Sequence, residues 1–418
     1  MTAVVPTASG TEHHRPHLER VSVAADGTQA NGMSFDPAIS SDGHYAAFRS
    51  RAHNLLPGAP NTIKLYLKDL RSGAVEQANV ASDADPDLRW VYEFSISATG
   101  RYVAFSSNAE QNGPGHVRDH HIYIRDRLTG RTKPLLGEKN RQGDANYPAI
   151  SADGRYVAFT SDRTDLAPGG GERQEDVYVR DRWRHTTRRV SVASDGSRAD
   201  YFSQWPVISA DGSKIGFHSL ADNLGAARST PWPEKSFYVH DMQTGRTRPA
   251  AQSRDSKAAV TVLRASLSPD GRYAAFASAT PDIVPGPVHG TGIWDCYVKD
   301  LRTGTTRRVS LTHDGSLANG NCSEPVMSPD GRRVFFTSDA HNIIPGGSNG
   351  WRGVFVRDLR TGTVERLDVS DDGAQGNGDS GSITVDRSGH RVLFDSWAHN
   401  LVPGDTNDTG DVFLRRLR

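Results

Sequence analysis

One phrase recurs seven times along the 418 residues, in its most regular form Ile-Ser-x-Asp-Gly-Arg-Tyr-Val-Ala-Phe-x-Ser. Its glycine returns at intervals of 54 to 60 residues. The seven copies fall at Gly43, Gly100, Gly154, Gly212, Gly271, Gly331 and Gly389. A self-similar period of this length, rich in short alternating segments, indicates one supersecondary unit that is stacked repeatedly in a row or a ring.

The third copy predicts how one unit folds. Residues 148–151 form a short extended run, and the Asp-Gly dipeptide that ends at Gly154 predicts a tight turn. Residues 155–159, 177–180 and 187–192 have the alternation and the β-branched or aromatic content of strands. Each unit is therefore an antiparallel meander of strands A to D, with A innermost. Seven such units predict an all-β fold, a seven-bladed β-propeller.

The two ends of the chain complete this prediction. The seventh copy has strands A, B and C, and the sequence then stops at Arg418. Residues 18–27 read like strand D of other copies, at 187–196 and 306–315. We therefore expect 18–27 to be the outer strand of the last blade, which closes the ring and leaves no open sheet edge there. The chain is then one domain, 18–418, after a flexible tail, 1–17.

Charge and hydropathy exclude some classes of partner. The 49 Lys and Arg residues balance the 49 Asp and Glu residues, so no global field favours nucleic acid or an anionic membrane. No apolar run reaches the length of a membrane span. The first 17 residues lack the apolar core of a secretory signal. We expect no nucleic-acid binding, no membrane insertion, and a cytoplasmic protein, or a secreted or periplasmic one if a signal has been removed.

The two cysteines, Cys296 and Cys322, fall in neighbouring blades and near the same face. Two free, partly buried thiols are the expected state, and a disulfide is the alternative.

The Ser-Pro-Asp-Gly-Arg form of the turn, at 268–272 and 328–332, resembles the WD-like repeat of the TolB propeller family. The phrase at 400–407, followed by Asp-Val-Phe-Leu, resembles an actinobacterial version of that repeat. The resemblance covers essentially the whole chain and implies a fold rather than an activity, because relatives of this fold include peptidase propellers and polysaccharide lyases. No α/β domain precedes the repeats, so the function of TolB is not carried over.

One repeat position carries six different residue types in the seven blades, whereas structural positions stay the same. It is the residue before the Pro of Pro-Ala-Ile-Ser, and we expect its seven side chains to ring the mouth of the axial channel. They are Asp36, Glu93, Tyr147, Trp205, Arg264, Glu324 and Ser382.

Two interpretations of this ring remain open. In the first, Trp205 and Tyr147 form a stacking wall for a sugar or an aromatic ligand, and Arg264 binds a carboxylate. The carboxylates of Asp36, Glu93 and Glu324 would then bind polar or cationic groups or act as general acid and base. In the second, the ring is a hydrated channel mouth in which Arg264 and Glu324 form an ion pair.

Four histidines are further candidates for a functional role. His218 replaces the Thr or Arg that follows the strand-B Phe in other blades, so it is a candidate for proton transfer together with Glu93 and Glu324. A hydrogen-bonded rim histidine is the alternative. The cluster of His116, His120 and His121 has spacing that suits a metal on a helix, although we expect a loop here.

The segment 405–411 has oxygen-bearing side chains at alternate positions, as at the start of a calcium loop. Its candidate ligands are Asp405, Asn407 and Asp411, with an Asx turn as the alternative. No other cofactor is expected.

These observations predict a scaffold that binds a small molecule or a protein on the mouth face. The rival is an enzyme, such as a lyase, hydrolase or isomerase, that acts in the funnel on a sugar or a natural-product intermediate. A purely structural interaction module is the third class.

Overall fold

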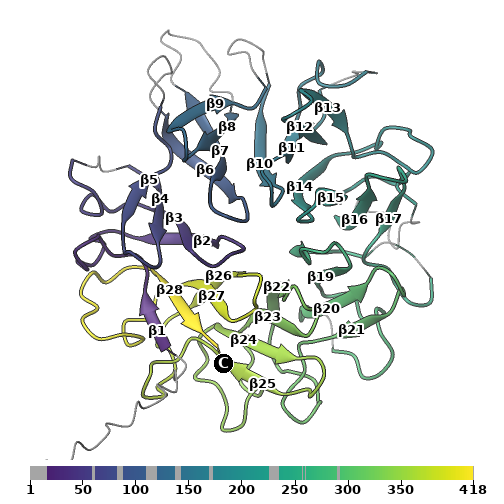
Figure 1. Ribbon diagram of the computed structural model, residues 1–418. Coiled ribbons are helices and arrows are strands. Elements are labelled where there is room, and N and C mark those ends of the chain that lie inside the picture. The colour runs from purple at the N-terminus through teal and green to yellow at the C-terminus, as the bar shows by residue number, and fades with distance from the viewer. Residues whose placement is uncertain are drawn as a thin grey trace, which may run out of the picture.

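The computed structural model describes residues 17–58, 62–81, 88–109, 120–136, 143–168, 173–225, 235–256, 258, 260–289 and 292–417. These residues form seven four-stranded antiparallel sheets and no helix. The sheets are arranged around a central axis like the blades of a propeller (Figure 1). The prediction of a seven-bladed β-propeller is confirmed. Within the described chain no helix is long and apolar enough to cross a membrane.

The four strands of each blade follow one another outward from the axis (Figure 1). The innermost strands A are β2 (Ser34–Ile39), β6 (Leu88–Ile96), β10 (Ala145–Ile150), β14 (Ser203–Ile208), β18 (Ala265–Leu267), β22 (Cys322–Met327) and β26 (Ser380–Val385). Strands B are β3 (Tyr45–Ser50), β7 (Tyr102–Ala109), β11 (Tyr156–Ser161), β15 (Lys214–Ser219), β19 (Tyr273–Ser278), β23 (Arg333–Ser338) and β27 (Arg391–Ser396). Strands C are β4 (Lys64–Asp69), β8 (His120–Asp126), β12 (Asp176–Asp181), β16 (Ser236–Asp241), β20 (Asp295–Asp300), β24 (Gly353–Asp358) and β28 (Asp411–Arg416). Strands D are β5 (Val75–Gln77), β9 (Arg131–Pro134), β13 (Thr186–Arg189), β17 (Thr247–Pro249), β21 (Thr306–Arg308), β25 (Val364–Arg366) and β1 (His17–Arg20).

The ring closes as the sequence predicted. Strand β1 pairs antiparallel with β28, with Leu18 opposite Arg415, and completes the last blade (Figure 1). The outer strand is shorter than expected, because after Arg20 the chain turns and makes an isolated bridge between Val23 and Gln29. His17 belongs to this strand and not to the tail. The remainder of the predicted tail, 1–16, lies outside the described residues.

An aromatic pair fills the interior of each blade. The Phe of strand B lies directly opposite an aromatic residue of strand C, with ring centroids 5.5 to 6.1 Å apart. The pairs are Phe48–Tyr66, Phe105–Tyr123, Phe159–Tyr178, Phe217–Tyr238, Phe276–Tyr297, Phe336–Phe355 and Phe394–Phe413. Such cross-strand pairs stabilise an antiparallel sheet beyond the apolar area that they bury. The repeated Phe therefore fixes the blade core, and the residue after it points to the opposite face.

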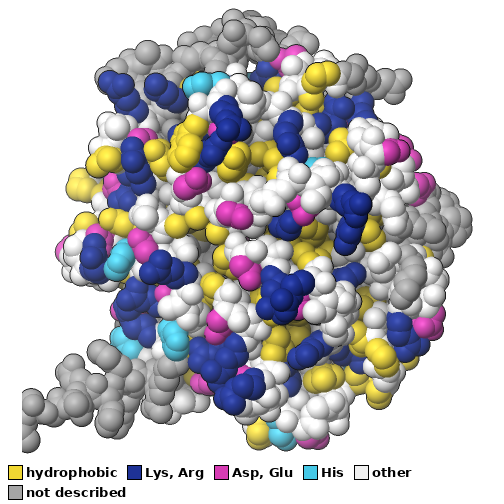
Figure 2. Space-filling view, turned by 45° about the vertical axis from the view of Figure 1, so that its right-hand side comes forward, with side chains coloured by type: hydrophobic (Ala, Val, Ile, Leu, Met, Phe, Trp, Pro, Cys, Tyr) yellow, Lys and Arg dark blue, Asp and Glu magenta, His cyan; other side chains and the backbone are white. Residues whose placement is uncertain are grey.

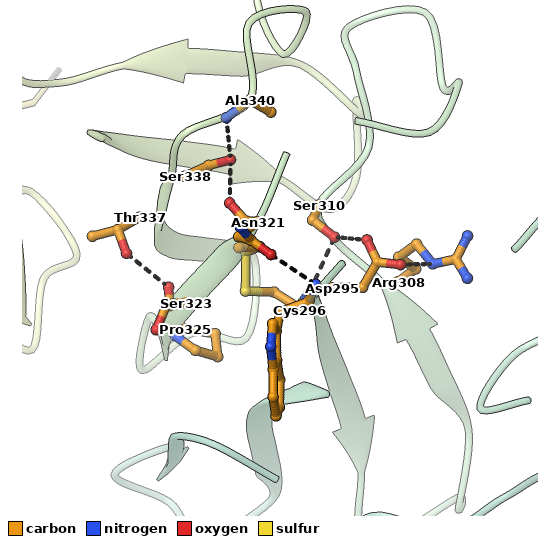
Figure 3. The surroundings of a disulfide bond; sticks show 12 residues. Asp295, Cys296, Arg308, Ser310, Asn321, Ser323, Pro325, Thr337, Ser338 and Ala340 are labelled. Carbon is orange, nitrogen blue, oxygen red and sulfur yellow. Dashed lines mark hydrogen bonds and ion pairs between the residues drawn. A yellow bond between two sulfur atoms is a disulfide. The ribbon is translucent and has the colours of Figure 1, made fainter. Parts of the chain in front are cut away.

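The two cysteines form a disulfide, with Cα atoms 5.5 Å apart. Cys296 lies on strand C of blade five and Cys322 on strand A of blade six, so the bond joins adjacent blades (Figure 3). Beside it, the Ser310 hydroxyl donates to the Asp295 carboxylate at 2.6 Å. The expectation of two free thiols was wrong and its alternative, a disulfide, is what forms, because the neighbouring blades bring the two side chains into direct contact.

Candidate functional site

The position predicted to ring the mouth is a bulge in the inner strand. In six blades the pairing of strands A and B shifts register at this residue, and in five of them its φ lies in the left-handed region. The five residues are Asp36 (49°), Tyr147 (55°), Trp205 (54°), Glu324 (52°) and Ser382 (52°). In four of them the next residue is proline, which disfavours the right-handed helical region for the residue before it. Each bulge turns its side chain out of the ladder and toward the axis.

All seven ring side chains line one cavity of about 710 Å³ at the centre of the propeller. Arg49, Tyr92 and His218 line it as well. The structure thus brings together the seven residues that the repeat comparison singled out, although they come from seven different blades. What they bind stays a prediction.

One side of the cavity is acidic and belongs to blades six, seven and one. Asp36 forms an ion pair with Arg49 of the neighbouring strand. Its backbone N–H donates to the Asp395 carboxylate at 2.9 Å, across the junction of the last and first blades. The backbone N–H of Ser382 donates to Glu324 at 2.8 Å. Neighbouring blades are therefore tied together through the backbone of the ring residues.

Asp395 lies directly behind this acidic wall and was missed by sequence reasoning. Burial raises the pKa of its carboxyl to about 6, and the negative charges of Asp36 and Glu324 act in the same direction. The signal was present in the sequence, because Asp395 follows a strand-B Phe and so occupies the same repeat position as His218.

Glu93 of blade two is engaged within its own blade. Its carboxylate accepts a hydrogen bond of 2.6 Å from the Ser106 hydroxyl. Its backbone N–H donates to Ser106 Oγ at 3.1 Å. This carboxylate is therefore held in place on the cavity wall.

The opposite side of the cavity is aromatic and cationic. Tyr147 meets Trp205 edge to face, with ring centroids 6.2 Å apart. The Lys235 ammonium lies 3.7 Å from the centre of the Trp205 ring. Arg264 is exposed to the cavity, and neither it nor Lys235 forms an ion pair with any described residue. The ion pair of Arg264 with Glu324, expected for an inert channel mouth, does not form.

His218 is buried between this wall and the blade interior. Its ring lies 5.5 Å from that of Trp205 and 5.2 Å from that of Phe237. Burial lowers the pKa of the imidazole to about 3, and the positive charges of Lys235 and Arg264 lower it further. His218 is therefore neutral at physiological pH. Because Lys235 precedes strand C, outside the position compared in the sequence, its part in the site was not predicted.

The predicted metal sites have other contacts. Asp405 and Asp411 both form ion pairs with the Arg20 guanidinium, at 3.0 and 3.2 Å. Asn407 donates to the Asp411 carboxylate at 3.3 Å. In the part of the chain that the structure describes, no group of three or more His, Cys, Asp or Glu side chains is arranged to hold a metal ion. Calcium at this loop stays a prediction, and Arg20 is the cation that it would have to displace.

The remaining histidine cluster and a Gly-x-Ser-x-Gly segment do not form a candidate site within the described residues. His116 lies outside the described residues, whereas His120 and His121 begin β8. His120 lies 3.3 Å from the Asp144 carboxylate. The segment 346–350 has Gly-x-Ser-x-Gly spacing, but it lies in the loop between β23 and β24. No helix follows it, so it is not the strand–turn–helix that a hydrolase nucleophile needs.

On the face visible in Figure 2, basic and acidic side chains are interspersed and form no single-sign patch. The expectation of no nucleic-acid binding stays a prediction.

No protein-family model matches the sequence, and the curated proteins contain no match to it. Among solved structures, oligogalacturonate lyase from Vibrio parahaemolyticus is similar over 97% of this chain and 95% of its own, with a TM-score of 0.59 and 12% identity. The β-propeller domain of the Trilobed protease from Pyrococcus furiosus is similar over 92% and 95%, with a TM-score of 0.56 and 14% identity.

TolB from Acinetobacter baumannii is matched over 92% of this chain and 63% of its own, with a TM-score of 0.40 and 15% identity. A similarity that low carries no argument. The comparisons therefore define this chain as a β-propeller, and the TolB-like resemblance of its repeats stays at the level of the fold.

Proposed function

We propose that the protein binds a small organic anion with a flat ring or sugar face in its axial cavity. The observation that carries this proposal is Arg264, which lines the cavity and forms no ion pair with a described residue. Lys235, whose ammonium lies over the Trp205 ring of the cavity wall, adds a second positive charge nearby. A guanidinium with a free fork of donors matches a carboxylate or phosphate in a bidentate geometry. A ligand anion would neutralise the surplus positive charge on this side.

The aromatic wall supplies the second half of the recognition. Trp205 and Tyr147 present partly exposed rings beside the two cations. Aromatic faces of this kind stack on sugars and on other rings, and they contribute apolar contact at low entropic cost. A ligand with a ring next to its acidic group would use both features at once.

Backbone strain at the ring position supports a binding role. A non-glycine residue in the left-handed region costs about 1 to 3 kcal/mol and persists where the surrounding structure imposes it, which is common at ligand sites. Here five such residues all lie on one cavity. Only two other described non-glycine residues, His185 and Asp408, have positive φ.

The test is calorimetric titration with cyclic carboxylates (benzoate, phenylacetate, cyclohexanecarboxylate and D-glucuronate) and with their neutral amides. We expect at least one acid to bind about tenfold more tightly than its amide, and Arg264→Ser to remove that difference. Ser is the residue that blade seven carries at this position, at Ser382. The matched control is Arg302→Ser, an exposed arginine in an outer turn. Equal binding of every acid and its amide would overturn the proposal.

Catalysis in the same cavity is the second candidate function, and the acidic wall favours it. Glu324 and Asp36 line the cavity, and Asp395 behind them has a pKa of about 6, so it can exchange a proton near neutral pH. A lyase, hydrolase or isomerase needs such groups. If a bound ligand is turned over, Glu324→Gln should abolish turnover with little change in melting temperature, because Gln can still accept the Ser382 N–H.

The disulfide between Cys296 and Cys322 bears on localisation. Disulfides persist in oxidising compartments and are rare in the cytosol. We therefore propose a location outside the cytoplasm, in preference to the cytoplasmic expectation. Fractionation of the native host with an antibody against the protein tests this assignment, and recovery only from the cytosol would contradict it.

A further inference from the structure

Among the described residues that line the cavity, only His218 has all of its side-chain polar atoms buried and without a hydrogen-bond partner of normal geometry. It is 3% exposed, and neither ring nitrogen has a hydrogen-bond partner of normal geometry. The backbone of Trp205 is the one polar group that acts on the ring as a hydrogen-bond partner, and it raises the pKa, as an acceptor of the imidazole N–H does. It nevertheless lines the cavity, next to Trp205 and Arg264. Buried polar groups in native proteins are nearly always hydrogen-bonded, so an unpaired imidazole on a cavity wall points to a partner that the cavity receives.

The same repeat position has a partner in other blades. Arg49 binds Asp36, Ser106 binds Glu93, and the Thr160 hydroxyl accepts the backbone N–H of Trp205 at 3.2 Å. For His218 the corresponding neighbour is the backbone of Arg264. Strand β18 begins only at Ala265, and Arg264 is not in the left-handed bulge that would turn its N–H toward the imidazole.

The charge state of His218 limits what it can bind. A neutral imidazole has one N–H donor and one acceptor nitrogen. Because the Trp205 backbone acts as an acceptor for the N–H, the other ring nitrogen needs a donor. A carboxylate has no proton to donate to it. A metal ion or an ammonium group would be repelled by Lys235 and Arg264, whose charges already act on His218. A hydroxyl group can donate to this nitrogen, and it carries no charge.

We infer that His218 recognises a hydroxyl group of the ligand, and that the ligand is a hydroxylated carboxylate whose acidic group binds Arg264 and Lys235. This inference rests on the proposed anion site and adds the chemistry next to the acidic group. His218 is then a specificity-determining residue, which rejects an analogue without the hydroxyl because its own polar atoms would stay buried and unpaired.

The experiment compares three pairs of carboxylates by calorimetry: mandelate with phenylacetate, 3-phenyllactate with 3-phenylpropionate, and D-glucuronate with cyclohexanecarboxylate. One member of each pair lacks the hydroxyl groups of the other. We expect at least one hydroxylated member to bind about tenfold more tightly than its partner. His218→Thr, which has the residue of blades three and six, should reduce this preference to about twofold or less while the deoxy acid binds as before.

A second variant, His218→Asn, keeps part of the polarity in case the threonine variant folds poorly, and thermal denaturation checks both. The control is His240→Gln, a buried histidine of the same blade that bonds Thr247 and does not line the cavity. Equal binding within every pair, or a hydroxyl preference that survives in both His218 variants, would overturn the inference and leave the anion site standing. Binding of none of the carboxylates would overturn the anion site itself and this inference with it.

Discussion

The Lys235 ammonium group lies 3.7 Å from the centre of the Trp205 indole ring. This contact holds a positive charge against an aromatic residue of the cavity wall, and both residues come from blade four. Burial lowers the pKa of Lys235, and the nearby charge of Arg264 lowers it further, whereas Glu175 acts in the opposite direction. Two like charges held close together, neither of them in an ion pair with a described residue, are the main reason to expect an anion in the cavity.

Removal of one of these charges should weaken anion binding without unfolding the blade. For Lys235→Met, which keeps an unbranched side chain over the indole, we expect about a fivefold loss of affinity for a bound carboxylate. We also expect a weaker dependence of affinity on salt, because screening acts on fewer charges. Titrations at low and high ionic strength measure both quantities. An unchanged affinity and salt dependence would show that Lys235 does not face the anion.

Ring closure should depend on the buried guanidinium of Arg20. Its ion pairs with Asp405 and Asp411 join the first strand to the last blade, and all three side chains are less than a tenth exposed. Arg20→Met leaves two buried carboxylates unpaired and should lower the free energy of unfolding by about 3–5 kcal/mol. The exposed pair of Arg254 and Asp255 provides the control, since Arg254→Met should cost less than about 1 kcal/mol. Urea denaturation distinguishes them, and equal effects would contradict this role of Arg20.

The disulfide should stabilise the junction of blades five and six. Cys296 and Cys322 are 26 residues apart in sequence, and chain entropy predicts about 3.5 kcal/mol of stabilisation for a loop of that length. The Cys296→Ala and Cys322→Ala double variant should therefore melt several degrees lower than the wild type. Mass spectrometry after alkylation without reductant should find no free thiol, and modification of both cysteines would contradict the bond.

The free energy of unfolding should depend on pH through the titration of Asp395. Its pKa is raised from 3.8 to about 6 in the folded state, so the native protein binds this proton more tightly than the unfolded chain does. The corresponding stabilisation is fully present below pH 3.8 and is lost as the pH rises through about 6. Asp395→Asn does not titrate, so it should gain on the wild type between pH 4 and pH 7 by at most about 3 kcal/mol. Urea denaturation of both proteins at several pH values checks this, and parallel pH profiles would show that the carboxyl titrates normally.

Gly216 and Phe237 should be coupled in the blade that carries His218. A Cβ atom at Gly216 would lie 2.4 Å from Phe237 Cζ and 2.8 Å from Val207 Cγ2. Gly216→Ala should therefore cost about 1–3 kcal/mol through overpacking. Blade three has Ala158 and Val177 at the two positions, so Gly216→Ala combined with Phe237→Val should recover much of the loss. A double-mutant cycle by urea denaturation measures this coupling, and simple additivity would contradict the contact.

The fold could be predicted from the sequence because every blade repeats the same sequence pattern. The Asp-Gly turns, the strand-B Phe and the truncated seventh copy predicted seven blades and closure by the N-terminal strand. The ring position was also predictable, since comparison across copies separates a variable residue such as Trp205 from the constant ones around it.

The remainder depends on contacts between blades, which one repeat does not contain. Asp395 acquires its raised pKa from burial at the junction of two blades, and the charges of Asp36 and Glu324 on the adjoining blades act in the same direction. The pairing of Cys296 with Cys322 and the placement of Lys235 over Trp205 likewise need the positions of strands in space. Arg264 could be predicted on the ring, but its lack of an ion-pair partner could not.

The most direct test of the anion site is a crystal structure of the protein in complex with the carboxylate that binds most tightly in the titrations. We expect its acidic group within hydrogen-bond distance of Arg264 and its ring against Trp205. A cavity that holds only water, with Arg264 paired to Glu324 and the carboxylate bound elsewhere, would contradict the account.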